Sequence, residues 1–281
     1  MKSYLDCIPC FFEQALRAGR IATDDEKLLK HLLDELGEKL RHISLESTPP
    51  ETGRLIYWMV KEITGNPDPF RKLKHESTQL ALELYPSLKK TIEESNDNLL
   101  TAIRIAIAGN IIDFGASAIF DINTAIKESL VKDFAIYDYS TFKNSLEKAE
   151  HVLYIGDNAG ETVFDRLLIE QLNKPVTYVV REKPVINDAT AEDAIQAGID
   201  KVAKIVSSGS DAPGTIPGIC SLEFREMLDS AEFVIAKGQG NYEGLSNEKR
   251  SIFFLLMTKC QIIANDLGVS KGDIVLKGIN I

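Results

Sequence analysis

A series of short apolar runs in the second half of the chain constrains the fold most. These runs occupy residues 151–156, 175–181, 204–207 and 233–237, and each is followed by polar loop residues and then by a helical pattern. Short, continuous apolar strands that alternate with helices are typical of a buried parallel sheet with right-handed crossovers. Two later runs, at 252–257 and 273–276, extend the series, with a helix expected at about 260–267 between them. We therefore predict an α/β domain with a mainly parallel sheet over residues 146–281.

The first half of the chain follows a different period. Apolar residues recur at three- and four-residue spacing from 11 to about 40 and from 51 to 64, and further helices are expected at about 70–85, 87–94, 99–108 and 121–132. This spacing indicates amphipathic helices, and Pro and Gly separate the segments. We find no strand pattern here, so we predict an all-helical N-terminal domain over residues 1–145.

Charge and composition exclude several classes of protein. The 281 residues carry 32 Lys and Arg against 42 Asp and Glu, a net charge of −10, and 44% are hydrophobic, as in a folded protein. The acidic excess argues against a general nucleic-acid binder. Apolar runs are far shorter than the ~18 residues of a membrane span, and Asp6 and Pro9 interrupt the region where a signal peptide needs apolar residues. We expect a cytoplasmic protein without a membrane or nucleic-acid partner.

The four cysteines, Cys7, Cys10, Cys220 and Cys260, are too few for a disulfide scaffold, which fits a reducing compartment. Cys7 and Cys10 form a C-x-x-C pair, but a zinc ribbon needs a second pair, and thioredoxin-like chemistry needs a preceding strand. We expect a local structural or weak metal-binding role for this pair.

Ligands of parallel α/β sheets bind beyond the carboxyl ends of the strands, which directs attention to the loop after the first run. Residues 156–161 read GDNAGE, so that Asp157 and Asn158 offer two oxygen donors between Gly156 and Gly160. The simpler interpretation is that one of them caps the following helix. The loop lacks the G-x-G-x-x-G pattern of a dinucleotide site.

The loop after the second run also ends in an amide and an acid, Asn187 and Asp188, before a helix. Alone, this pair is an ordinary helix cap. Because neighbouring strands lie ~4.8 Å apart, the two loops would lie roughly 5–10 Å from each other. Asp157, Asn158 and Asp188 would then share one divalent cation, and all-oxygen ligation favours Mg²⁺ or Mn²⁺ over structural zinc.

The third loop places Lys237 at a strand end, followed by Gly238 and Gly240. A lysine beside approachable backbone amides is typical of a phosphate cradle. A flexible turn with a solvated lysine explains the same residues equally well.

In the helical half, residues 109–115 read GNIIDFG and interrupt a helical pattern with Asn110 and Asp113. Burying such groups without partners costs ~1–3 kcal/mol each. Either this is a turn between helices, capped by Asn110, or it faces the α/β domain and completes a site across the cleft.

Taken together, these segments resemble the DUF89 family, also called the damage-control phosphatase or ARMT1-like family. The matching elements, in order, are Gly109-Asn110-x-x-Asp113, Asp157-Asn158-Ala159-Gly160-Glu161, Asn187-Asp188-Ala189-Thr190 and Lys237-Gly238-x-Gly240-Asn241. The pair Cys7-x-x-Cys10 resembles the prokaryotic branch of that family. The resemblance covers essentially the whole chain.

The resemblance implies a helical domain over a Rossmann-like α/β domain, with a divalent metal (Mg, Mn, Co or Ni) at the cleft and hydrolysis of small phosphorylated metabolites such as sugar phosphates. It implies Asp157, Asn158 and Asp188 as metal ligands and Lys237 as the phosphate-side cation. The expected catalytic residues are Asp157, Lys237 and Glu161, and the expected substrate-binding residues are Asn110, Asp113, Asn187, Gly238, Gly240 and Asn241.

Three points stay open in the sequence. The attacking group is either water or Asp157, which would form an aspartyl-phosphate. An S-adenosylmethionine-dependent methyltransferase and a non-catalytic metal or metabolite sensor are the alternative functions. The substrate, the physiological metal and the oligomeric state do not follow from the residues.

Overall fold

A computed structural model describes the backbone of residues 1–109 and 119–281 and the side chains of 1–109, 124 and 126–281. The helices are α1 (Cys7–Ala22), α2 (Glu26–Leu40), α3 (Pro49–Thr64), α4 (Arg71–Glu93), α5 (Asn98–Ala108), α6 (Ile119–Val131), α7 (Tyr139–Lys148), α8 (Thr162–Leu172), α9 (Ala191–Gln196), α10 (Leu222–Ser230), α11 (Gly238–Leu245) and α12 (Gln261–Leu267). The strands are β1 (Phe134–Tyr137), β2 (Val152–Ile155), β3 (Val176–Val180), β4 (Lys204–Ser207), β5 (Phe233–Lys237), β6 (Ile252–Met257) and β7 (Ile274–Ile279).

The strands of the described ranges form one seven-stranded sheet in the order β1-β7-β6-β5-β2-β3-β4. Within it, β6 and β7 pair antiparallel, and the other neighbouring pairs are parallel. The apolar runs predicted as strands lie in β2 to β7, so the prediction of an α/β fold with a mainly parallel sheet is confirmed.

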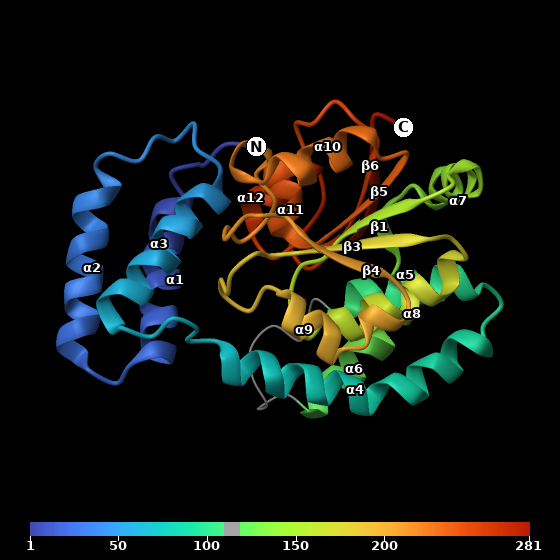
Figure 1. Ribbon diagram of the computed structural model, residues 1–281, viewed down its shortest axis with the longest axis horizontal. Helices are drawn as coiled ribbons and strands as arrows, with labels where there is room; N and C mark the ends of the chain where they lie inside the picture. The colour runs from blue at the N-terminus through green and yellow to red at the C-terminus, as the bar shows by residue number, and fades with distance from the viewer. Residues whose placement is uncertain (110–118) are drawn as a thin grey trace.

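The central strands are apolar throughout because both faces of the sheet are covered. Val152 and Tyr154 of β2 join the buried cluster that contains α4, α5 and α8. Leu153 and Ile155 point to the opposite face, where they pack with residues of α10, α11 and α12. Successive residues of a strand face opposite sides, so a strand buried on both sides shows no polar alternation. Figure 1 shows the two helical layers on either side of the sheet.

The expectation of no strand before residue 145 was wrong. Phe134–Tyr137 forms β1, which pairs with β7 at the edge of the sheet. Its residues alternate between half-buried and exposed, because an edge strand has only one well-covered side. Four half-exposed residues give too short a pattern to be recognised by period.

The expected break between helices at 70–85 and 87–94 was also wrong. Residues Arg71–Glu93 form one helix with Pro86 inside it. Proline removes one backbone hydrogen bond from a helix interior, but the packing of Ala81, Leu88 and Ile92 against the buried cluster continues on both sides of it.

Two groups of helices have different packing partners. Helices α1, α2 and α3 share a buried cluster with Val185 of the β3–α9 loop, and in Figure 1 they stand beside the sheet as a separate group at the left. Helices α4 and α5 share their cluster with the sheet itself. Packing partners therefore change between α3 and α4, while the domain boundary at residue 145 stays a prediction. No helix in the described part of the chain combines the length and apolar character needed to cross a membrane.

The order of the strands places a crevice at the carboxyl ends of the central strands. β2 pairs with β3 on one side and with β5 on the other, all parallel. The helix after β2 covers one face and the helix after β5 covers the other. The carboxyl ends of these three strands therefore lie side by side at the point where the connecting helices switch from one face of the sheet to the other. Ligands bind at this point in such folds.

Candidate active site

The loop after β2 presents Asp157 and Asn158. Gly156 packs so closely on Tyr178 that a Cβ there would overlap the tyrosine hydroxyl, so this position requires glycine. Asp157 is 8% exposed and Asn158 is 6% exposed. Both side chains line a cavity that lies between the loops at the carboxyl ends of the strands and helices α1 and α3.

The loop after β3 brings Asp188 to the same place. Asn158 and Asp188 form an isolated antiparallel bridge, and the Ala189 amide donates to the Asp157 carbonyl at 2.8 Å. These backbone contacts hold the two loops together. Asp157, Asn158 and Asp188 therefore line one side of one cavity, as the sequence pattern predicts.

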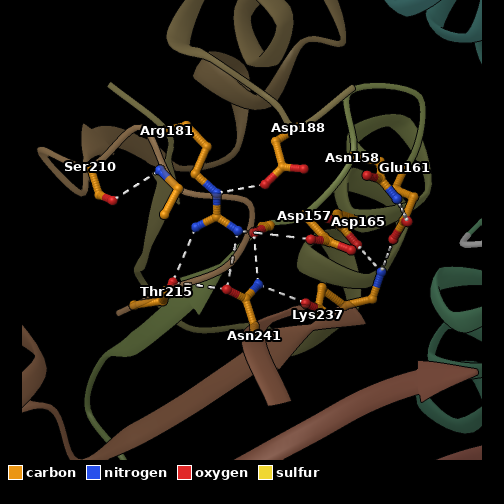
Figure 2. Close-up of polar contacts among 12 residues, drawn as sticks. Asp157, Asn158, Glu161, Asp165, Arg181, Asp188, Ser210, Thr215, Lys237 and Asn241 are labelled. Atoms are coloured by element: carbon orange, nitrogen blue, oxygen red, sulfur yellow. Dashed lines mark hydrogen bonds and ion pairs between the residues drawn. The ribbon is translucent and has the colours of Figure 1, made fainter. Parts of the chain in front are cut away.

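Arg181, at the end of β3, holds this acidic cluster together. Its Nε donates to Oδ2 of Asp188 at 2.7 Å, and its Nη2 lies 3.8 Å from Oδ1 of Asp157. The same guanidinium donates to Thr215 and to Asn241, each at 3.1 Å. Figure 2 shows Arg181 at the centre of these contacts. Because the side chain is 1% exposed, the arginine is a fixed internal counter-ion.

Lys237 is the second internal counter-ion. Its ammonium donates to Glu161 Oε2 at 3.0 Å and to Asp165 Oδ1 at 2.9 Å, and its side chain is fully buried. The hydroxyls of Tyr154 and Tyr178 donate to the two oxygens of Asp165, both at 2.7 Å. Lys237 thus pairs with two carboxylates, which leaves a net negative charge in this part of the network.

Glu161 connects this internal network to the cavity. The Asn158 Nδ2 donates to Oε1 of Glu161 at 2.6 Å, while the other Glu161 oxygen accepts from Lys237. The amide nitrogen of Asn158 is therefore directed to Glu161, and its oxygen is the atom that a cation would bind.

Negative charge exceeds positive charge in this network. Four carboxylates (Asp157, Glu161, Asp165 and Asp188) contact or neighbour two cationic groups, those of Arg181 and Lys237. Burial raises the pKa of Asp157 well above its usual range, and the charges of Asp188 and Glu161 raise it further. Burial likewise raises the pKa of Glu161 and of Asp188, against the opposing effects of Lys237 and Arg181.

The donor set and the charge excess both fit a hard divalent cation. Two carboxylates and one amide oxygen are the ligands that such ions prefer, usually with added waters. A dication would also offset the charge that disfavours ionisation of Asp157 and Asp188. Among the described residues, no group of three His, Cys, Asp or Glu side chains is arranged to hold a metal, so this candidate site depends on Asn158.

The segment after Lys237 is a helix, α11, and not a flexible turn. It begins at Gly238, whose φ is +76°, and a Cβ at this position would overlap Oδ2 of Asp157. Glycine here lets the start of a helix approach the carboxylate, where helix N-termini favour negative charge. Gly238 thus sets the position of Asp157.

The predicted substrate-binding residues differ in where they lie, and Gly238 and Asn241 are not among the residues that line the cavity. Asn187 and Gly240 line the cavity. Asn241 is fully buried, and its Nδ2 donates to the carbonyls of Gly156 and Lys237 at 3.0 and 2.7 Å, so it ties the loops together. Asn110 and Asp113 lie outside the described residues.

The cavity measures about 320 Å³, at the lower end of small-molecule sites. Its outer wall comes from α1 and α3, including Arg17 and Tyr57, and its rim includes Lys259. The Tyr57 hydroxyl donates to Gln14 Oε1 at 3.1 Å. Burial, together with the charge of Asp188, raises the pKa of Tyr57.

Sequence analysis did not identify several residues of this region, namely Arg17, Tyr57, Asp165, Arg181 and Lys259. A signal existed for Arg181, since a cation directly after an apolar strand ends up between the acidic loops. Asp165 lies four residues after Glu161, in the first turn of α8, which is also readable from spacing. For residues of α1 and α3, the helical period does not show which face of each helix packs over the loops at the carboxyl ends of the strands.

Comparison with known proteins shows what this chain is similar to. The damage-control phosphatase ARMT1-like domain matches residues 3–275. An uncharacterized protein of Methanocaldococcus jannaschii is 36% identical over 96% of this chain and 93% of its own length. A damage-control phosphatase of Pyrococcus horikoshii is 34% identical, covering 98% of this chain and 97% of its own. Another, from Archaeoglobus fulgidus, is 33% identical over 96% and 97%.

A solved structure agrees with these sequences. The crystal structure of a DUF89 family protein from Pyrococcus horikoshii has a TM-score of 0.90 and 34% identity, covering 98% of both chains. The family match spans nearly the whole chain and three relatives exceed 30% identity. The chain therefore belongs to the ARMT1-like damage-control phosphatase (DUF89) family.

Proposed function

We propose that this chain is a divalent-metal-dependent phosphatase that hydrolyses small phosphate monoesters. The observation that carries the proposal is the convergence of Asp157, Asn158 and Asp188 on one cavity, inside a network with more carboxylates than cations. The names of the relatives from Pyrococcus horikoshii and Archaeoglobus fulgidus support the reaction class.

Each residue has a distinct task in this proposal. Asp157, Asn158 and Asp188 would hold the ion (Mg²⁺, Mn²⁺, Co²⁺ or Ni²⁺), which when bound offsets charge on phosphate oxygens. Arg181 orients Asp188 and lies beside Asp157, while Glu161 orients the Asn158 amide. Lys237 acts as a positioning residue through Glu161. Its predicted contact with phosphate stays a prediction.

The chemical step is the hydrolysis of a phosphate monoester to an alcohol and inorganic phosphate. The P–O bond to the alcohol breaks, and oxygen from water ends on phosphorus. Either water attacks directly, or Asp157 attacks first and water then cleaves the aspartyl-phosphate. Trapping of a phosphorylated protein during turnover distinguishes these routes.

The test compares Asp157→Asn with Asp200→Asn, a control in which the acid is exposed on a short helix after α9. With p-nitrophenyl phosphate and Mn²⁺, we expect Asp157→Asn to lower the rate by at least about a hundredfold. Calorimetry should show weaker Mn²⁺ binding as well. The control should match the parent protein in both measurements.

Other outcomes would contradict the proposal. Unchanged turnover in Asp157→Asn with bound metal would refute the ligand assignment. Stoichiometric binding of S-adenosylmethionine without phosphate release would favour a methyltransferase. Tight ligand binding without turnover over a broad panel of phosphate esters would favour a sensor.

A further inference from the structure

Two cationic side chains, Arg17 and Lys259, line the same cavity as the acidic cluster. Arg17 comes from α1, and Lys259 lies between β6 and α12. These segments are far apart in the sequence, and they meet because α1 packs over the loops at the carboxyl ends of the strands. The cavity is therefore lined by the acidic cluster along the sheet loops, and elsewhere by these two cationic side chains together with the carboxyls of Asp6 and Glu243.

Arg17 and Lys259 are both exposed to solvent, yet the pKa of each group lies below its ordinary value. Burial lowers the pKa of Arg17. Burial and the charge of Arg17 lower the pKa of Lys259 to about 7. Because the charge of Arg17 acts on Lys259, an anion in this part of the cavity would be attracted by both side chains at once.

Helix α1 lines the cavity over two helical turns. Cys10, Gln14 and Arg17 lie on one face of α1, at helical spacing, and all three line the cavity. Seven residues of helix span about 10 Å at 1.5 Å per residue. Tyr57 connects the two regions, because the charges of both Asp188 and Arg17 act on its hydroxyl. A small metabolite can thus contact the acidic cluster and the cations at once.

We propose that Arg17 and Lys259 form a second anion subsite, so that the preferred substrate is a phosphate ester with a second anionic group, a phosphate or a carboxylate. The reacting phosphate would lie at Asp157, Asn158 and Asp188, and the second group would bind between the two cations. This inference rests on the proposed function for the identity of the first site, while the cationic pair stands on the cavity itself.

The experiment measures binding of three phosphonates that share a three-carbon chain and cannot be hydrolysed. Propylphosphonate has no second anionic group, 3-phosphonopropionate has a carboxylate, and propane-1,3-diphosphonate has a second phosphonate. Calorimetry with Mn²⁺ present is done on the parent protein and on Arg17→Gln and Lys259→Gln. Arg20→Gln is the matched control, since Arg20 is exposed on α1 and does not line this cavity.

We expect the parent protein to bind one or both doubly anionic compounds at least about tenfold more tightly than propylphosphonate. The compound preferred shows whether the second group is a carboxylate or a phosphate. Arg17→Gln and Lys259→Gln should each remove most of this preference and leave propylphosphonate binding unchanged. Arg20→Gln should keep it.

Equal binding of the three compounds by the parent protein would overturn the subsite. A preference that survives in both Arg17→Gln and Lys259→Gln would overturn it as well. Turnover of p-nitrophenyl phosphate, measured separately, tests the proposed phosphatase function. A protein that shows the binding preference without turnover would retain the subsite and lose the phosphatase assignment.

Discussion

At the scale of single residues, the site is a set of buried charges that hold one another in place. Arg181 and Lys237 are both enclosed, and each contacts two acids. The sequence pattern identified Asp157, Asn158 and Asp188 because they follow strands, and Lys237 because it ends one. It could not show that the Lys237 ammonium is directed away from the cavity, because this orientation depends on Glu161, the residue before α8, and on Asp165 of α8.

Lys237 should be required for the stability of the fold. Lys237→Met leaves Glu161 and Asp165 facing each other without their counter-ion, which should lower the free energy of unfolding by about 3–5 kcal/mol. Urea unfolding measures this loss, and Lys143→Met, on exposed α7 surface, is the control. Unchanged stability together with weaker phosphate binding would contradict the positioning role and support the contact with phosphate predicted from the sequence.

A second residue, Glu243, should make stability depend on pH. Burial raises its pKa from 4.5 to about 7, and Gln239 Nε2 donates to its Oε1 at 2.8 Å. A carboxyl whose pKa is higher in the folded state contributes stability that is present below its unfolded pKa and is lost as pH rises through the folded value. Glu243→Gln should therefore reduce the fall in urea midpoint between about pH 5 and pH 8. If the exposed control Glu226→Gln reduces it equally, this assignment is wrong.

At the scale of elements, the carboxyl ends of β2, β3 and β5 determine where the chemistry lies. Their apolar runs are visible in the sequence because strands covered on both faces contain no polar alternation. The short edge strand β1 and the single helix α4 were missed, because half-exposed strands and an internal proline give weak or misleading local signals. The spacing of apolar residues therefore predicts the central strands that carry the site better than it predicts the edge strand β1.

The start of α11 provides the prediction at this scale. Gly238→Ala places a Cβ against the Asp157 carboxylate at a φ of +76°. We expect activity and Mn²⁺ affinity to fall at least about tenfold, because the ligand must move. Gly268→Ala is a matched control: its φ is +70°, and no described atom lies within 4 Å of a Cβ there. Both variants should lose about 1–3 kcal/mol of stability from the backbone alone; equal activity in both would contradict the account.

At the scale of the whole molecule, the cavity exists because helices α1 and α3 pack over the loops at the carboxyl ends of the strands. These helices and loops are far apart in the sequence, and Figure 1 shows the helices beside the sheet. The sequence predicts these helices, yet amphipathic spacing says only that one face is covered and not by what. This is why Arg17 of α1 and Tyr57 of α3 escaped sequence analysis, whereas Asp157, Asn158 and Asp188 in the loops after the strands did not.

The most direct test is a crystal grown with Mn²⁺, examined at a wavelength where manganese scatters anomalously. An anomalous peak within ligand distance of the Asp157 and Asp188 carboxylates and the Asn158 amide oxygen is the predicted result, with Arg181 still bonded to Asp188. A crystal in which these oxygens surround only solvent, or in which manganese binds elsewhere, would contradict the assignment of this cavity as a metal-dependent active site.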